Sequence, residues 1–152
     1  MKQLKYGWIG GGKAAVKVPM AASQTIKDQS GKFVYMDDGG AKLCVDTNAY
    51  IFGHLEVGTE NGEITPSAGD YLNCIVDVTA KFRIPVNSGI YVVGMLGDKC
   101  DIAISTNVQG AQLDASAEDL LFVVGGDADD NNYVDVMINP GALASADGGV
   151  ED

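Results

Sequence analysis

Hydrophobic and polar positions alternate most clearly between residues 71 and 86. Every even position in this stretch is apolar, whereas the odd positions include asparagine, aspartate, threonine, lysine and arginine. A period of two places one face of a β-strand against a core and the other face toward water. Because strands in globular proteins usually run about five to six residues, we expect a bend or a bulge within the stretch, or two strands in line.

The same alternation returns near the C-terminus, where Val134, Val136 and Ile138 lie on one side of a predicted half-buried strand. Residues 90–96 and 120–124 are instead nearly continuous apolar runs bounded by glycines. Such runs are typical of central strands that are covered on both faces. Four further segments have the composition of strands: residues 32–36, 41–45, 51–57 and 101–105.

Turn and helix signals complete the predicted fold. The Asp-Asp-Gly-Gly sequence at residues 37–40 predicts a hairpin between two of these strands. Residues 113–121 have apolar side chains at helical spacing, and Asp114 or Ser116 could cap a short helix that gives way to strand near Leu120. Many short strands with glycine, asparagine and aspartate turns, and at most one short helix, predict an all-β fold, either a small barrel or a sandwich.

The length of 152 residues suits a single domain, whose predicted β body spans residues 20–140. Residues 1–19 combine lysines with a run of three glycines and end at Pro19, which predicts an extended N-terminal arm. Residues 141–152 consist mainly of alanine, glycine, serine and acidic residues. This composition predicts a flexible acidic tail.

The net charge of the chain and the length of its apolar stretches argue against nucleic acid and membranes as partners. The chain has 21 acidic and 10 basic side chains, a formal net charge of -11, so it lacks the basic footprint of a nucleic-acid-binding protein. No apolar stretch approaches the ~20 residues of a membrane-spanning helix, and we expect synthesis in the cytosol and no membrane partner. Cys44, Cys74 and Cys100 are widely spaced and odd in number, which predicts buried free thiols.

Two motifs suggest chemistry but fit it poorly. Residues 7–14 satisfy G-x-x-x-x-G-K, yet Ala14 stands where a phosphate loop needs serine or threonine for magnesium. The aspartate and asparagine residues at 127–132 predict a hairpin loop, and their spacing departs from that of an EF-hand. Calcium binding by this loop stays open.

Nothing in the sequence supports catalysis. His54 is the single histidine, and alternation within residues 51–57 predicts that its side chain faces water. The serines do not lie in a G-x-S-x-G motif, so no nucleophile is indicated. We therefore expect a protein that is not an enzyme and holds no cofactor or metal.

The predicted arm carries the candidate partner-binding residues, which are Tyr6, Trp8, Ile9, Val16 and Val18. An extended apolar segment of this kind can add as a strand to the edge of a partner's sheet, with its aromatic ring in a pocket. The segment can equally fold back on its own domain or oligomer. Both alternatives are open on the sequence alone.

Several features stand in a fixed order between residues 15 and 140: Val16, Val18 and Pro19; Gly31-Lys32-Phe33-Val34-Tyr35 and a glycine turn; Ile51-Phe52-Gly53; Gly62-Glu63-Ile64; and Val123-Val124-Gly125-Gly126-Asp127. In this order the chain resembles the capsid decoration, or cement, proteins of tailed bacteriophages. The resemblance implies a small β-barrel or β-tulip domain, often trimeric, that sits on the outer capsid and ties its subunits together.

The resemblance leads us to expect a virion structural protein, made in the host cytoplasm, that binds the assembled major capsid protein as a homotrimer and stabilises the shell. An acidic surface suits an outer-shell protein, which must remain soluble. The alternative is a phage tail or fibre protein, or a carbohydrate-binding β-sandwich that would use Tyr71, Tyr91 or Tyr133.

Overall fold

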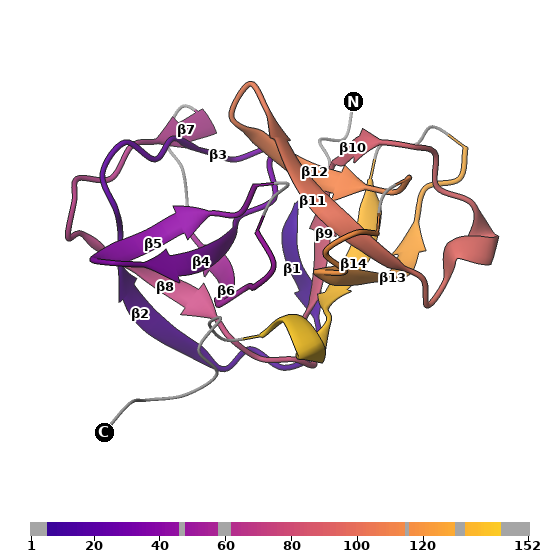
Figure 1. The fold of residues 1–152 in the computed structure, drawn as a ribbon, viewed down its shortest axis with the longest axis horizontal. Helices are drawn as coiled ribbons and strands as arrows, with labels where there is room; N and C mark the ends of the chain where they lie inside the picture. The colour runs from indigo at the N-terminus through magenta and orange to yellow at the C-terminus, as the bar shows by residue number, and fades with distance from the viewer. Residues whose placement is uncertain (1–5, 46–47, 58–61, 115, 130–132, 144–152) are drawn as a thin grey trace.

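The computed structural model describes residues 6–45, 48–57, 62–114, 116–129 and 133–143. They form two lobes that lie side by side (Figure 1), each built on one main sheet. The strand order of the five-stranded sheet is β2 (Ala15–Pro19), β8 (Tyr71–Ile75), β6 (Gly53–Glu56), β4 (Phe33–Asp37) and β5 (Gly40–Leu43). The order of the seven-stranded sheet is β1 (Gly7–Gly10), β9 (Lys81–Ile84), β14 (Val134–Ile138), β13 (Leu121–Gly126), β11 (Lys99–Ser105), β12 (Val108–Gln112) and β10 (Val86–Ser88).

The fold is all-β, as the alternation predicts. The remaining elements are a two-stranded sheet of β3 (Ile26–Lys27) and β7 (Glu63–Ile64), and two 3-10 turns, η2 (Val93–Met95) and η3 (Pro140–Ala142). Within the described ranges the sheets do not close into a barrel, so the arrangement is sandwich-like rather than a barrel. Neither 3-10 turn, and no other helical segment of the described chain, is long and apolar enough to cross a membrane.

Each lobe buries a hydrophobic core. The core of the five-stranded lobe consists of Val18, Met20, Ile26, Val34, Ala41, Leu43, Leu55 and Cys74. The larger core belongs mainly to the seven-stranded lobe, and Phe33, Cys44, Ile51 and Ile75 reach it from the other lobe. Neighbouring residues such as Phe33 and Val34 point to opposite faces of a strand. The five-stranded sheet is therefore covered on both faces, and this burial joins the two lobes.

The alternating stretch at residues 71–86 contains the bend that its length predicts. Strand β8 ends at Ile75 in one sheet, and β9 begins at Lys81 in the other. The turn between them is held by Asp77, whose Oδ1 accepts hydrogen bonds from the backbone N (2.9 Å) and the hydroxyl (2.6 Å) of Thr79. The alternating stretch therefore forms two strands, one in each main sheet.

The N-terminal segment is not an arm within the described residues, which corrects the predicted division at residue 19. Strand β1 pairs with β9 and β2 pairs with β8, so residues 7–19 follow the 71–83 stretch through both lobes. At the crossing, a Cβ on Gly11 would lie 1.9 Å from the Thr79 carbonyl oxygen, and one on Gly12 would lie 2.1 Å from Asp77 Oδ2. The glycine run therefore permits a close backbone crossing.

Gln109 of β12 connects the two sheets. Its Oε1 accepts from Phe33 N (2.7 Å), and its Nε2 donates to the carbonyls of Phe33 (2.9 Å) and Cys44 (3.1 Å). The backbone N of Gln109 also donates to Ser30 Oγ at 2.8 Å. A fully buried amide that replaces a missing strand neighbour in this way satisfies backbone groups that would otherwise be costly to bury.

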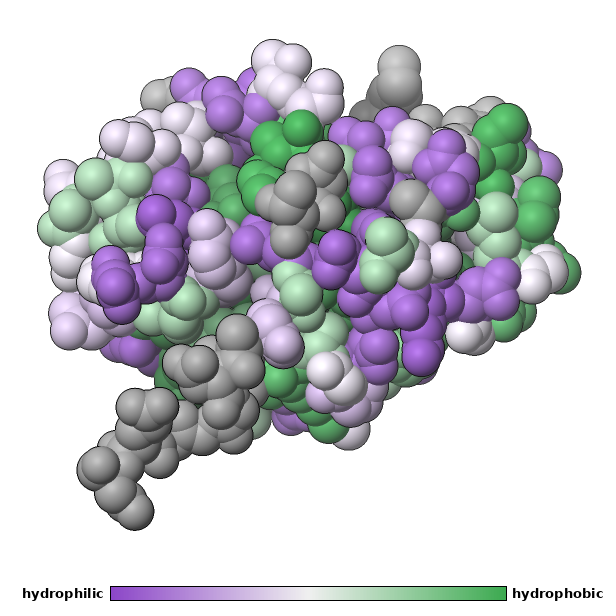
Figure 2. Space-filling view, in the orientation of Figure 1, coloured by the Kyte–Doolittle hydropathy of each residue, from purple (hydrophilic) through white to green (hydrophobic). Residues whose placement is uncertain are grey.

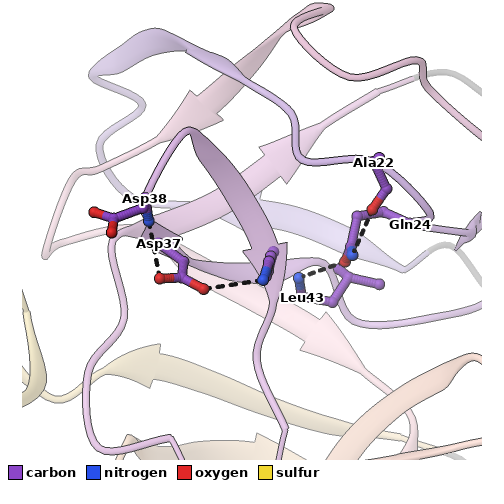
Figure 3. Close-up of polar contacts among 6 residues, drawn as sticks. Ala22, Gln24, Asp37, Asp38 and Leu43 are labelled. Carbon is purple, nitrogen blue, oxygen red and sulfur yellow. Dashed lines mark hydrogen bonds and ion pairs between the residues drawn. The ribbon is translucent and has the colours of Figure 1, made fainter.

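The predicted hairpin at residues 37–40 is confirmed. Asp37 pairs with Gly40, and Gly39 takes the positive φ of 89° that a two-residue turn requires. The Asp37 carboxylate accepts from Asp38 N (2.8 Å) and binds Lys42 Nζ (2.9 Å), as Figure 3 shows. At the other end of β5, Gln24 Oε1 accepts from Leu43 N at 3.0 Å, which satisfies a donor of this edge strand.

Most of the other predicted strands are present. The predicted segments 32–36, 41–45, 51–57, 101–105, 120–124 and 133–139 correspond to β4, β5, β6, β11, β13 and β14. The predicted tail begins too early, because Ala142 is buried and Leu143 forms a bridge with Ile51. Residues 144–152 lie outside the described ranges.

Two element predictions are wrong. Residues 90–96 are a loop with the 3-10 turn η2, not a central strand. The described residues of the predicted helix at 113–121, which leave out residue 115, contain no helix, and β13 begins at Leu121. The carboxylate of Asp101, not a helix cap, binds the backbone N–H groups of this segment. It accepts from the backbone N atoms of Ala117 (2.9 Å), Glu118 (2.9 Å) and Asp119 (2.8 Å).

Candidate protein-binding surface

Residues 90–96, which we call the apolar loop, expose hydrophobic side chains to solvent. Ile90 is 66% exposed and Val93 is 69% exposed, and Val92 and Leu96 are both more than half exposed. The loop lies at the right edge of Figure 1, and Figure 2 shows hydrophobic side chains gathered at that edge. A contiguous exposed apolar segment of this kind is typical of a protein interaction site.

Packing and hydrogen bonds anchor the apolar loop to the rest of the seven-stranded lobe. Tyr91 is buried in the larger core, where its ring lies directly on Gly126: a Cβ there would lie 2.7 Å from the ring. Within the loop, Met95 N donates to Val92 O (2.9 Å); directly after it, Gly97 N donates to Val123 O of β13 (2.8 Å). An ordered loop loses little conformational entropy on binding.

An open groove of about 630 Å³ lies beside the apolar loop. Its lining residues are Met95, Gly97, Asp98, Lys99, Cys100, Leu113, Asp114, Ser116, Asp119 and Val123. Met95 belongs to both the loop and the groove, so a partner that covers one extends over the other. Of these lining residues, Asp119 is held by a hydrogen bond from its backbone N to Asp101, which also accepts from the backbone N atoms of Ala117 and Glu118.

The five residues predicted to bind a partner lie in different environments. Val18 is 3% exposed in the core of the five-stranded lobe and is therefore not available to a partner. Trp8 packs against the larger core, its Nε1 donates to Gly12 O (3.1 Å), and Tyr6 is also half-buried. Ile9 and Val16 are exposed. A role in binding stays a prediction for Ile9 and Val16, and also for the half-buried Tyr6 and Trp8.

His54 is buried, which contradicts the prediction that it faces water. It is 1% exposed, it stacks on Phe82 with a centroid distance of 4.4 Å, and its Nε2 accepts from Lys32 N at 3.1 Å. Desolvation, with a smaller contribution from the Lys32 charge, lowers the pKa of His54 from 6.5 to about 3. The alternation rule fails here because β6 is covered on both faces.

The segment that matches G-x-x-x-x-G-K has a structural explanation. Gly12 N donates to Thr79 Oγ1 (3.0 Å) and Ala14 N donates to Asp77 Oδ2 (3.3 Å). A phosphate loop binds its ligand with backbone N–H groups and leads into a helix. Here these two N–H groups are bonded within the chain, and the strand β2 follows.

The candidate metal and thiol sites are also located. Part of the acidic cluster, residues 130–132, lies outside the described ranges, and in the rest Asp127 Oδ1 accepts from Asp129 N at 3.0 Å. Among the described residues no group of three or more histidine, cysteine, aspartate or glutamate side chains is arranged to hold a metal ion. Cys44, Cys74 and Cys100 are buried free thiols, as predicted.

The tyrosines considered for sugar binding do not form one surface feature. Tyr71 is 64% exposed, whereas Tyr91 is buried beneath the apolar loop. Tyr133 lies under the guanidinium of Arg83, 4.0 Å from the ring centroid, and Arg83 in turn binds Asp135. Of the three, only Tyr71 presents a largely open ring.

Sequence reasoning missed the apolar loop because an exposed apolar run and a buried strand have the same composition. The one available signal was Gly94 within the run, since glycine is disfavoured in strand interiors. Comparisons of the chain with protein-family models, with curated proteins and with solved structures found no match.

Proposed function

We propose that this chain is a protein-binding structural module that attaches to the outside of an assembled phage capsid and stabilises it, as a decoration or cement protein. The observation that carries the protein-binding part is the ordered, exposed apolar loop with Ile90 and Val93 at its surface. The sequence resemblance supports the choice of the capsid as partner. The function that follows is structural, with the major capsid protein as ligand and a homotrimer as the active form.

Stabilisation would follow from mass action. A ligand that binds only the assembled state lowers its free energy, and several copies bound to one shell add avidity. The packed cores of the two lobes and their shared burial suit this role, because a binder that is already folded spends less of its interaction energy on ordering. The formal net charge of -11 also fits a protein on the outer face, away from packaged nucleic acid.

The direct test uses expanded shells prepared without this protein from the virus that carries its gene. Purified protein is added, and cosedimentation and resistance of the shells to heat are measured. The proposal predicts saturable binding and a higher temperature of shell disruption. The absence of both effects would overturn it.

A matched pair of variants assigns the binding to the apolar loop. Val93→Asp places a charge on the loop and should weaken shell binding by about tenfold or more, while it changes folding stability by only about 0.5 kcal/mol. Met36→Asp is the control, because Met36 is also exposed but lies on the β4–β5 hairpin. Equal loss of binding in both variants would contradict a role for this loop.

A further inference from the structure

Acidic side chains surround the groove beside the apolar loop. Asp98, Asp114 and Asp119 line it, and Lys99 is the one basic residue among its lining. The wall also includes apolar side chains of Met95, Leu113 and Val123. The groove therefore combines an apolar surface with an excess of negative charge.

These acidic residues are set on fixed backbone. Asp98 N donates to Met95 O (2.8 Å), and Asp98 O accepts from Val123 N (2.9 Å). Asp114 Oδ1 accepts from Ser88 Oγ at 2.7 Å, and Asp119 O accepts from Asn139 Nδ2 at 2.7 Å. A partner that covers the apolar loop would take these charges out of water, which is costly unless opposite charge meets them.

We infer that the apolar loop and the groove form one docking surface for a protein segment that carries arginine or lysine beside apolar side chains. The aliphatic stem of such a residue suits the apolar wall, and its charged end suits the aspartates. This inference rests on the proposed function only in taking a protein as ligand. It adds the chemistry of the segment that binds.

The charge of the groove favours a basic protein segment over a second copy of this chain as the ligand. The chain has 21 acidic against 10 basic side chains. A two-fold contact through this surface would place the same acidic groove against itself, and like charges across an interface are unfavourable. A basic partner is attracted by the same field, and its association should weaken as salt screens that field.

The inference is tested with three tripeptides, blocked at both ends, that differ only in the middle: Ile-Arg-Ile, Ile-norleucine-Ile and Ile-Glu-Ile. Each is titrated into the isotopically labelled full chain, and backbone amide shifts are followed by NMR. We expect the arginine peptide to bind about threefold to tenfold more tightly than the norleucine peptide, with the largest shifts at Gly97, Asp98 and Asp119. Equal binding by all three peptides, or shifts confined to other regions, would overturn the inference.

Two variants complete the design. Asp98→Asn combined with Asp114→Asn should abolish the preference for arginine, whereas Asp38→Asn, an exposed aspartate in the β4–β5 turn, should preserve it. Retention of the preference in the double variant would contradict the inference. The shell experiment separates the two proposals: shell binding without any arginine preference refutes only the docking chemistry, and arginine preference without shell binding refutes only the capsid as partner.

Discussion

Gly11 lies where the two connections between the lobes cross. Its φ of 78° is in the left-handed region, and an added Cβ would lie 1.9 Å from Thr79 O. Both conditions exclude a side chain at this position without backbone movement. The polar contacts of Asp77 and Thr79 with this segment depend on the same close approach.

Gly11→Ala should therefore lower the free energy of unfolding by about 2 kcal/mol or more. Gly39→Ala is the matched control, because Gly39 also has a positive φ (89°) but has open space where its Cβ would lie. Urea denaturation measures both. A loss in Gly11→Ala no larger than in Gly39→Ala would show that the crossing is not tight.

His54 should make stability depend on pH. The unfolded chain binds a proton at His54 with a pKa near 6.5, but the folded chain binds it only near pH 3 because the ring is desolvated. The stabilisation by neutral His54 is therefore complete above the unfolded pKa and is lost as pH falls toward 3. Between about pH 7 and about pH 5.5, where few carboxylates titrate, unfolding free energy should fall by roughly 1 kcal/mol.

The control for this titration is His54→Gln, which keeps an acceptor near Lys32 N. Because the chain has one histidine, the variant should lose most of the slope in that pH range. Chemical denaturation at several pH values measures it. An unchanged slope in the variant would mean that His54 is not the group responsible.

At the scale of elements, one carboxylate holds the backbone of residues 117–119, which lead into β13. Asp101, which is buried, accepts hydrogen bonds from the backbone N–H groups of residues 117–119, of which Asp119 lines the groove. Hydrogen bonds to an ionised group are the stronger kind. The loop is thus ordered without a helix.

Asp101→Asn should destabilise the protein by about 2 to 4 kcal/mol, because an amide nitrogen would face a backbone donor and one acceptor oxygen would be lost. Amide exchange at residues 117–119 should accelerate along with this loss. Asp38→Asn, an exposed position, should change neither quantity. A stable Asp101→Asn protein with unchanged exchange would contradict the role of this carboxylate.

At the scale of the whole molecule, Gln109 joins the lobes through hydrogen bonds from its side chain to the backbone of Phe33 and Cys44. Gln109→Leu should cost about 2 kcal/mol or more of unfolding free energy, because the N–H of Phe33 loses its acceptor and the carbonyl of Cys44 loses the Gln109 amide. The carbonyl of Phe33 loses one of its two donors and keeps Cys44 N at 2.9 Å. Gln112→Leu, half-buried on the same strand, is the control and should cost far less. Similar losses in both variants would contradict a specific connection.

Local signals predicted the elements whose structure is decided locally. The 37–40 hairpin follows from turn chemistry, and the strand at residues 134–138 follows from alternation with one buried face. Long-range contacts decided the other elements. The glycine run at residues 10–12 predicted a flexible arm, because the segment that it crosses, around Thr79, is more than 60 residues away in the sequence and gives no local signal. The environment of His54 likewise depends on Phe82, which belongs to the other lobe.

The candidate surface was the least predictable part. The run at residues 90–96 has the composition of a buried strand, and only the burial of Tyr91 and the turn at η2 leave its other side chains exposed. The prediction that residues of the N-terminal segment bind a partner rests on their apolar and aromatic side chains alone. In the structure, residues 7–19 pair with strands of the same chain, so part of their apolar surface packs within the chain.

Hydroxyl-radical footprinting of the chain, free and bound to capsid shells, measures whether the apolar loop is covered on binding. The oxidation rate is measured by mass spectrometry at three exposed apolar sites: the loop at residues 90–96, Tyr71 and Met36. If the apolar loop is the binding surface, binding lowers oxidation of the loop severalfold and leaves the oxidation of Tyr71 and Met36 unchanged. Bound protein whose loop is oxidised as fast as in the free chain would contradict this role of the loop.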